Sequence, residues 1–299
     1  MSRLENMTLI AITCGIYASP HRFIDALSGL YQCTVYEDPV LVKQTAQAHN
    51  LKTDLLFRSI QCRQIPFDNF THDRKKCLAA LKVQISQNIL NGPCLFSGVL
   101  SHLIPASVSG IYRIMSATPM RIRRQRAMSL YQLSNQAAAT AIARSDQRDQ
   151  RFAAQLNLDS LWDSARHDMV LEWSKIDAAT HDITREAVSQ TLEKIRPDIE
   201  SSMENANKNM HAVDFNISSR VEAALAGLGH HLIVESDSGH VMVTLDRKVM
   251  NLARAQKEIV DIARAVPGVE SVKTKIGPNF YKGGIVRNLN LTAPFKRKT

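Results

Sequence analysis

Residues 9–23, Leu9-Ile10-Ala11-Ile12-Thr13-Cys14-Gly15-Ile16-Tyr17-Ala18-Ser19-Pro20-His21-Arg22-Phe23, decide the fold of this chain. The apolar run at 9–12 predicts a buried strand. The helical spacing of Phe23, Ile24 and Leu27 predicts a helix directly after a short loop. A strand, a loop and a helix in this order predict the start of an α/β domain.

The loop between these two elements has the frame of a P-loop without most of its phosphate-binding groups. Such a loop needs glycines whose N–H groups wrap the phosphates, a lysine for their charge, and Ser or Thr for Mg²⁺. On the G-x-x-x-x-G-K-[ST] spacing from Gly15, the last three places hold Pro20, His21 and Arg22. Proline has no N–H, and a neutral His is a poor substitute for Lys. Either Ser19 and Pro20 form an ordinary helix start, or Arg22 is a surviving phosphate contact.

The composition is that of a globular chain with two domains. Apolar residues make up 44% of 299 residues, enough to bury a sizeable core. No stretch approaches the roughly 20 apolar residues of a membrane span. The N-terminus does not resemble a signal peptide, so we expect a cytoplasmic protein. The five cysteines are scattered, which favours reduced thiols, and no metal-ligand spacing occurs.

The net charge of +9 indicates an anionic partner, such as a nucleotide, a nucleic acid or lipid headgroups. The basic residues lie mainly in 121–126 and in the tail. Neither patch is interleaved with aromatic residues that would stack on bases, so nucleic acid is the least expected of these partners.

Residues 8–195 alternate predicted strands with predicted helices, which favours a parallel sheet covered by helices on both faces. The predicted strands are 9–12, 33–36, 94–98, 110–115 and 168–173. The first predicted helix begins at Phe23. The others cover 40–48, 75–90, 119–130, 135–158 and 184–195. Arg196-Pro197 should end the last helix, and the polar stretch 196–213 is interpreted as a linker.

A small α+β domain is predicted for residues 214–278. Its elements are a helix at 218–228, strands at 231–235 and 241–245, a helix at 252–266 and a strand at 269–276. The resulting order is α-β-β-α-β. Residues 279–299 are basic and lack periodicity, so we expect a flexible tail.

Six short passages of the first domain match the motifs of one kinase family in their order along the chain. They are Tyr17-Ala18-Ser19-Pro20-His21-Arg22, Val35-Tyr36-Glu37-Asp38, 92–98, Ala117-Thr118-Pro119 with the arginines that follow, 143–152, and Trp162-Asp163 before the last strand. In this order they resemble the cytidylate-kinase-like family of P-loop kinases. The resemblance covers residues 8–195.

This resemblance implies ATP and Mg²⁺ as cofactors and a nucleotide as ligand. It implies catalytic roles for the lid arginines, which share one helical face, and for Asp38, which would bind substrate or position Mg²⁺. The implied catalytic residues are Arg144, Arg148, Arg151 and Asp38. The implied cofactor-binding residues are Gly15, Ser19, His21, Arg22, Arg121 and Arg124.

Two alternatives remain open for these residues. The lid arginines, interleaved with Asp146 and Asp149, would equally form a solvated, ion-paired helix face. Asp38, next to Pro39, would equally be a helix cap or a turn residue. Trp162 and Trp173 are expected in the core.

The second domain resembles a BON domain, a small module implicated in phospholipid or ligand binding. The matching residues are 217–225, Gly239 with Val243-Thr244-Leu245, and Pro267-Gly268-Val269. Gly268 is expected to supply a positive φ in the turn before the last strand. The resemblance implies a module that reads an unknown ligand or protein partner.

Three functions therefore remain. Pro20 and His21 favour a pseudokinase, a nucleotide-responsive or structural regulatory protein that carries a BON-like module. The lid arginines favour the alternative of an active nucleotide or small-molecule kinase. The third is a peripheral scaffold that docks on anionic lipid through the BON-like module and the tail, with Phe280, Tyr281 and Phe295 as apolar anchors.

Overall fold

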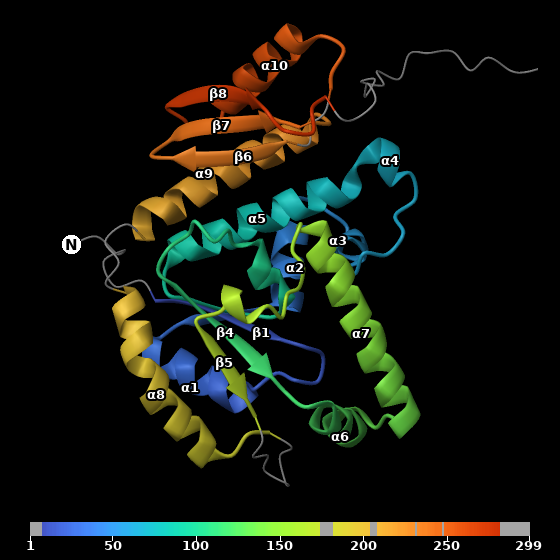
Figure 1. The fold of residues 1–299 in the computed structure, drawn as a ribbon, viewed down its shortest axis with the longest axis vertical. Coiled ribbons are helices and arrows are strands. Elements are labelled where there is room, and N and C mark those ends of the chain that lie inside the picture. Colours follow the sequence, from blue (N-terminus) through green and yellow to red (C-terminus); the bar gives the residue numbers. More distant parts are fainter. Residues whose placement is uncertain (1–7, 174–181, 204–207, 231, 247, 282–299) are drawn as a thin grey trace, which may run out of the picture. The chain divides into compact units, whose positions relative to one another are not determined.

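The computed structural model describes residues 8–173, 182–203, 208–230, 232–246 and 248–281 (Figure 1). The chain forms two compact units, Met1–Asn216 and Ile217–Thr299. Among the helices that the structure describes, none has the length and apolar character needed to cross a membrane.

The first unit is built on a five-stranded parallel sheet, as expected. Its strands are β1 (Leu9–Cys14), β2 (Thr34–Glu37), β3 (Cys94–Ser97), β4 (Ile111–Ala117) and β5 (Met169–Glu172). They lie in the order β2-β3-β1-β4-β5, and every neighbouring pair is parallel. The chain leaves β1 toward one edge and later crosses to the other. In open α/β sheets, ligands bind at the carboxyl ends of the strands beside such a crossing.

Helices cover both faces of this sheet because side chains of β1 alternate between two hydrophobic clusters. Leu9 and Ala11 pack with α2 (Asp38–Ala48), α3 (Thr53–Ile60), α5 (Asp73–Asn91) and α7 (Asn135–Gln155). Ile10 and Ile12 pack with α1 (His21–Tyr31) and α8 (Arg185–Met203). Figure 1 shows α1 and α8 on one side of the sheet and α2 and α5 on the other.

Shorter elements connect these layers. They are α4 (Asp68–Thr71), the 3₁₀ turns η1 (Val99–Leu103) and η2 (Ser164–Arg166), and α6 (Met120–Tyr131), which follows β4. Helices α3 and α4 were not expected from the sequence. Apart from these and from the end of α8, the bounds of each predicted strand and helix of the first unit lie within a few residues of an observed element.

The prediction that Arg196-Pro197 ends a helix is wrong, because α8 continues through Pro197 to Met203. Ile195 and Ile199, on either side of the proline, are fully buried. Their packing stabilises the helix across the N–H that proline lacks. The stretch 196–213 also contains the start of α9 (Lys208–Gly227). The division between the two units falls inside α9.

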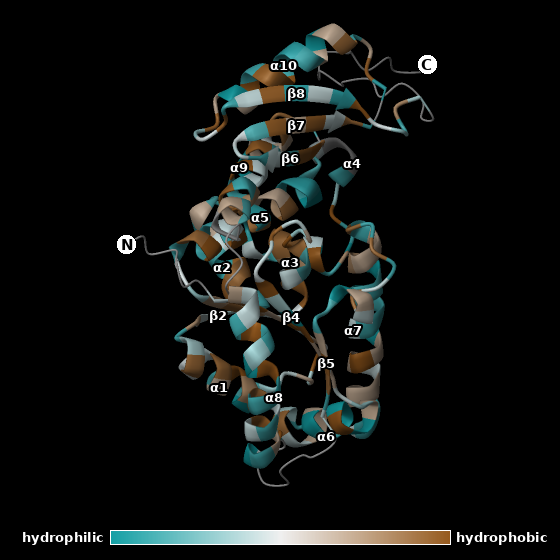
Figure 2. Ribbon diagram, turned by 60° about the vertical axis from the view of Figure 1, so that its left-hand side comes forward, coloured by the Kyte–Doolittle hydropathy of each residue, from teal (hydrophilic) through white to brown (hydrophobic). Residues whose placement is uncertain are grey.

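The second unit continues from α9 with β6 (Ile233–Asp237), β7 (His240–Leu245), α10 (Leu252–Arg264) and β8 (Ser271–Ile276). Strand β7 pairs antiparallel with β6 and parallel with β8. Figure 2 shows β7 as largely hydrophobic, in keeping with the burial of Val241, Val243 and Leu245.

Two predictions for the end of the chain have different outcomes. Phe280, expected as an exposed anchor, is buried in the core of the second unit, so that prediction is wrong. Tyr281 is exposed. Phe295 and most of the expected tail lie outside the described residues.

Candidate functional site

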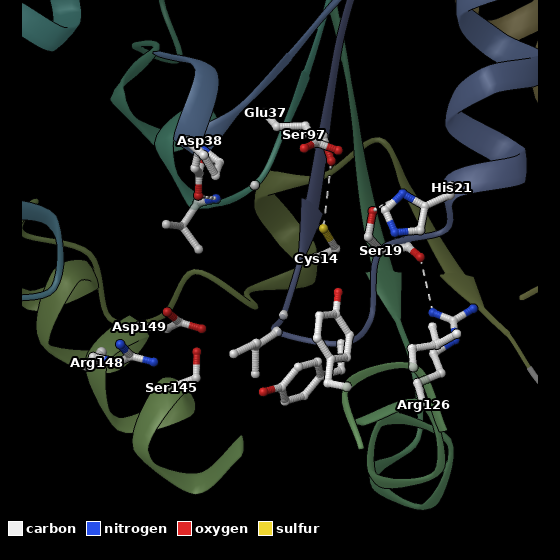
Figure 3. Close-up of a pocket in the computed structure, with 18 of the residues that line it drawn as sticks. Cys14, Ser19, His21, Glu37, Asp38, Ser97, Arg126, Ser145, Arg148 and Asp149 are labelled. Atoms are coloured by element: carbon white, nitrogen blue, oxygen red, sulfur yellow. Dashed lines mark hydrogen bonds between the residues drawn. The ribbon is translucent and has the colours of Figure 1, made fainter. Parts of the chain in front are cut away.

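The candidate site is a cavity of about 490 Å³ at the carboxyl edge of the sheet, called the central cavity here. The ends of β1, β2 and β3 contribute Cys14, Asp38 and Ser97. Figure 3 shows Ser145, Arg148 and Asp149 of α7 across the cavity from the loop residues Ser19 and His21. Of the residues predicted to bind cofactor, Gly15, Ser19 and His21 line this cavity.

The loop after β1 closes on itself in a tight turn. The N–H of Ala18 donates to the carbonyl of Gly15 at 3.0 Å, and Tyr17 has a φ of 58°. Left-handed φ values are rare for residues other than glycine. The predicted N-cap at Ser19 is wrong. Helix α1 begins at His21, Pro20 holds the cap position, and no side chain caps it.

The start of α1 is bound instead by the protein's own carboxylate. The backbone N–H of Arg22 donates to Asp182 Oδ2 at 3.0 Å. Asp182 Oδ1 accepts from the Arg126 guanidinium, also at 3.0 Å. Both side chains are buried, and Arg126 also donates to the Ser19 carbonyl, as Figure 3 shows. The N-terminus of a helix favours an anion, and here that anion is Asp182.

The two predicted arginines of α6 do not face the loop. Arg121 is exposed, and Arg124 lies 3.5 Å from Asn135 Oδ1. Their neighbours Arg123 and Arg126 face it instead. Arg123 forms a salt bridge with Asp146, with Nη2 and Oδ1 at 2.7 Å, and donates to the Ile16 carbonyl.

A sequence signal for these two arginines existed. Ile122 and Ala127 are the buried apolar residues of α6, so the position one turn before Ala127 and the position one turn after Ile122 lie on or beside the inward face. Those positions are Arg123 and Arg126. Arg22, the predicted phosphate contact, donates from its Nη1 to the carbonyl of Ile183 at 3.1 Å.

Only one of the three lid arginines lines the central cavity. Arg148 does so, whereas Arg144 and Arg151 are exposed. The inward stripe of α7 runs through Ser145, Asp149 and Phe152, each one residue beyond a predicted arginine. The stripe therefore brings a carboxylic acid into the site where the sequence predicted a set of cations.

Asp149 is a titratable group of this cavity that sequence reasoning placed on a solvated face. Burial raises its pKa to about 7, and the nearby charges of Asp146 and Asp38 add to the effect. Cys14 lies 3.8 Å from Ser97 Oγ, and burial raises the pKa of its thiol to about 12. The thiol is therefore a poor nucleophile at neutral pH.

Asp38 acts as a cap for a neighbouring element. Its two carboxylate oxygens accept the backbone N–H groups of Val99 and Leu100 at 2.9 and 3.0 Å, at the start of η1. Gly98 has a φ of 131°, and a Cβ there would collide with this carboxylate. Burial raises the pKa of Asp38 to about 6. The alternative that Asp38 is the cap of the helix at Pro39 is wrong, because Glu37 holds the cap position of α2 and Asp38 accepts the N–H groups of η1 instead.

These residues do not fit the magnesium ion that the kinase resemblance implies. Both oxygens of Asp38 are used by backbone N–H groups. The loop offers Arg22 where the motif has Ser or Thr. Within the described residues, no group of three or more His, Cys, Asp or Glu side chains is arranged to hold a metal.

A second cavity of about 550 Å³ lies beside the carboxyl ends of β4 and β5 and is lined by Ala117, Pro119, Arg123 and Trp162, among others. Trp162 is partly buried against the core. Trp173 is buried, packs on Phe23 with the ring centres 5.2 Å apart, and donates to Ser116 Oγ. The prediction that Trp173 is a core residue is confirmed.

Comparison with known proteins places these features in a family. An uncharacterized protein from Eubacterium ventriosum is similar over 65% of this chain and 99% of its own, with 13% identity and a TM-score of 0.44. Shikimate kinase from Bacteroides thetaiotaomicron is similar over 64% and 99%, with 8% identity and a TM-score of 0.37. Shikimate kinase from Acinetobacter baumannii, solved with shikimate, is similar over 65% and 96%, with 10% identity and a TM-score of 0.37.

No curated protein matches the sequence. The sequence profile of the cytidylate kinase-like family matches residues 10–175, more than half of the chain. The match includes β1, the loop after it, the arginine-bearing helices α6 and α7, and β5. This chain belongs to the cytidylate kinase-like family.

Proposed function

We propose that this protein is a pseudokinase of the cytidylate kinase-like family that acts in the cytoplasm as a nucleotide-responsive or structural regulatory protein. Its phosphate loop is closed by Asp182, so phosphoryl transfer from ATP is absent or strongly reduced. Any nucleotide response then depends on displacement of this carboxylate.

The observation that carries the proposal is the double contact of Asp182. Its carboxylate accepts hydrogen bonds from the N–H of Arg22 at the helix start and from the guanidinium of Arg126. Groups of these two kinds bind phosphate in such loops. A nucleotide phosphate must displace a buried, ion-paired carboxylate to reach them. Pro20 removes a further donor, and Tyr17 stands in a left-handed position that suits glycine.

Calorimetric titration of the full chain with ATP and Mg²⁺ tests this proposal. We expect at most millimolar affinity for the wild type. Asp182→Asn should bind roughly tenfold tighter, because the amide is uncharged and has only one oxygen left to accept the hydrogen bonds that both carboxylate oxygens accept. Asp25→Asn is the control, since Asp25 is an exposed acid on α1 and its loss changes the net charge equally. Micromolar binding by the wild type, unchanged in Asp182→Asn, contradicts the proposal.

A second candidate is an active kinase that transfers phosphate from ATP to a nucleotide or small molecule. Arg126, Arg148 and Asp149 in one cavity favour it, because phosphoryl transfer depends mainly on positioning and on stabilisation of charge. The assay is transfer of labelled γ-phosphate to CMP and other nucleoside monophosphates. Transfer that is lost in Arg148→Gln and kept in Arg264→Gln, a change at an exposed arginine of α10, would establish this function and refute the pseudokinase.

We propose that residues 214–278 form a BON-like module for a ligand or a protein partner. The α-β-β-α-β order and the φ of 92° at Gly268, which agrees with the expected positive φ, support this. Sedimentation of the full chain with anionic phospholipid vesicles at low salt tests the lipid alternative. Failure to sediment with the vesicles would leave a small ligand or a protein as the partner.

A further inference from the structure

A third cavity of about 270 Å³ shares no lining residue with the other two. Polar side chains from four segments meet there, and we call it the basic cavity. Thr13 comes from β1, His102 from η1 and Arg113 from β4, while Arg166 and His167 precede β5. None of these five residues was a predicted site residue.

Thr13 lies between the two imidazoles and fixes their orientation. Its Oγ1 is 3.0 Å from Nε2 of His102 and 3.1 Å from Nε2 of His167. His167 Nδ1 lies 2.8 Å from the carbonyl oxygen of Asp163, which can only accept, so Nδ1 carries the proton. In the neutral ring Nε2 then accepts from the Thr13 hydroxyl. That hydroxyl in turn accepts from the Nε2–H of His102.

Positive charge accumulates around these imidazoles. Burial lowers the pKa of His102 to about 3, and His167, Arg166 and Arg113 lower it further. Burial also lowers the pKa of His167, and both arginines add to this effect. Burial lowers the pKa of Arg113, and the charge of the Asp168 carboxylate opposes this effect. The same carboxylate accepts the Arg113 backbone N–H at 2.7 Å. Two guanidinium groups and two imidazoles thus surround the space with one carboxylate at its edge.

We propose that the basic cavity binds a small oxyanion of the phosphate type. Arg113 has five N–H donors and is held in place by its Nη2, which donates to the Pro105 carbonyl at 3.1 Å. Guanidinium groups bind tetrahedral oxyanions through paired, charge-assisted hydrogen bonds. The volume exceeds that of several waters, at about 30 Å³ each, so it accommodates such an ion with part of its hydration. The site is independent of the loop after β1.

Phosphate is favoured over a carboxylate for two reasons. The two guanidinium groups approach from β4 and from the segment before β5, and a tetrahedral ion presents oxygens in both directions. A dianion also offsets more of the mutual repulsion between Arg113 and Arg166. Once an anion is bound, protonation of His102 is opposed less strongly, so its pKa should rise.

The test uses the full chain, with histidine ring ¹⁵N resonances followed as inorganic phosphate is added at constant ionic strength. We expect the signals of His102 and His167 to shift in a saturable way, and the titration of His102 to move to higher pH. Arg166→Gln, a change at an exposed side chain, should weaken binding roughly tenfold. Arg254→Gln, an exposed arginine of α10, should leave it unchanged.

Three results would overturn the proposal. One is the absence of a saturable shift at millimolar phosphate. Another is an equal response in Arg166→Gln, which would mean that phosphate acts on these rings without entering the cavity. The last is acetate binding as tightly as phosphate, which would assign the cavity to carboxylates.

Discussion

The central cavity and the basic cavity both lie beside β1, but they differ in how arginines are paired with carboxylates. Thr13 and Cys14 are neighbours in β1, and each lines a different cavity. Around the loop, each inward arginine of α6 forms a salt bridge with a carboxylate, Arg126 with Asp182 and Arg123 with Asp146. In the basic cavity, Arg113 and Arg166 lie together and lower the pKa of the same two histidines.

This difference is the physical basis of the proposed loss of phosphate binding at the loop. The positive charge has not disappeared from the loop region. It is neutralised by two carboxylates of the protein, those of Asp146 in α7 and of Asp182, which lies before α8. Variants that remove those acids, or that disturb either cavity, test the comparison.

The largest effect is expected from Asp182→Ala. Arg126 is 5% exposed, and the substitution removes the carboxylate with which it forms a salt bridge at 3.0 Å. Loss of one member of a buried pair costs about 4 kcal/mol. Chemical denaturation should show this fall, and added sulfate should restore stability in the variant more than in the wild type. A variant as stable as the wild type would mean that Asp182 does not hold the loop closed; Asp25→Ala controls for charge.

A smaller loss, about 3 kcal/mol, is expected for Gly98→Ala at the edge of the central cavity. The new methyl group would collide with the Asp38 carboxylate and would also stand at an unfavourable φ. Gly92→Ala is the matched control, because Gly92 has a φ of 142° with open space around its Cβ position. Equal losses in the two variants would show that the contact with Asp38 does not restrict position 98.

In the basic cavity, Thr13→Val should cost about 2 kcal/mol. The substitution keeps the shape of the buried side chain and removes the hydroxyl that links His102 and His167. Both Nε2 atoms then lose their partner, and the ¹⁵N shifts of His102 should report a mixture of tautomers. The Asp163 carbonyl should keep the proton of His167 on Nδ1. If stability and tautomers remain those of the wild type, the hydrogen-bond relay through Thr13 is not formed in solution.

The last predicted effect is a pH dependence of stability at Asp149, confined to the range between about pH 4 and pH 7. Its pKa is raised from 3.8 to about 7, so the folded protein holds this proton more tightly than the unfolded chain. Wild-type stability should therefore fall as pH rises from about 4 to 7. Asp149→Asn lacks this contribution, so its stability relative to the wild type should increase over that range.

Urea denaturation at several pH values measures this difference. Asp25→Asn, at an exposed acid, should show a constant offset from the wild type. A constant offset for Asp149→Asn as well would mean that Asp149 titrates normally and is not a buried acid of the central cavity.

The layered sheet was predictable from the sequence because burial leaves a periodic pattern. Strand β1 is an apolar run, and the helices that cover it repeat apolar residues at helical spacing. Pro197 was misread because a local rule for helix ends competed with packing. Ile195 and Ile199 are buried on both sides of it, and that burial depends on residues far away in the chain.

The site was less predictable because its decisive contacts are polar and distant in sequence. Asp182 meets the N–H of Arg22 across 160 residues, and no periodicity marks such a pair. The choice between Arg121 and Arg123 depended on which face of α6 turns inward, and the buried Ala127, one turn after Arg123, marks that face. His102 and His167 lie in irregular segments, so their meeting at Thr13 left no signal.

The most direct test of the account follows the backbone amide resonance of Arg22 in the ¹⁵N-labelled full chain while ATP and Mg²⁺ are added. Because Asp182 already accepts this N–H, we predict no shift in the wild type below millimolar nucleotide and a saturable shift in Asp182→Asn. A saturable shift of the wild-type resonance at micromolar ATP would show that the loop binds phosphate in spite of Asp182, and would contradict the central claim.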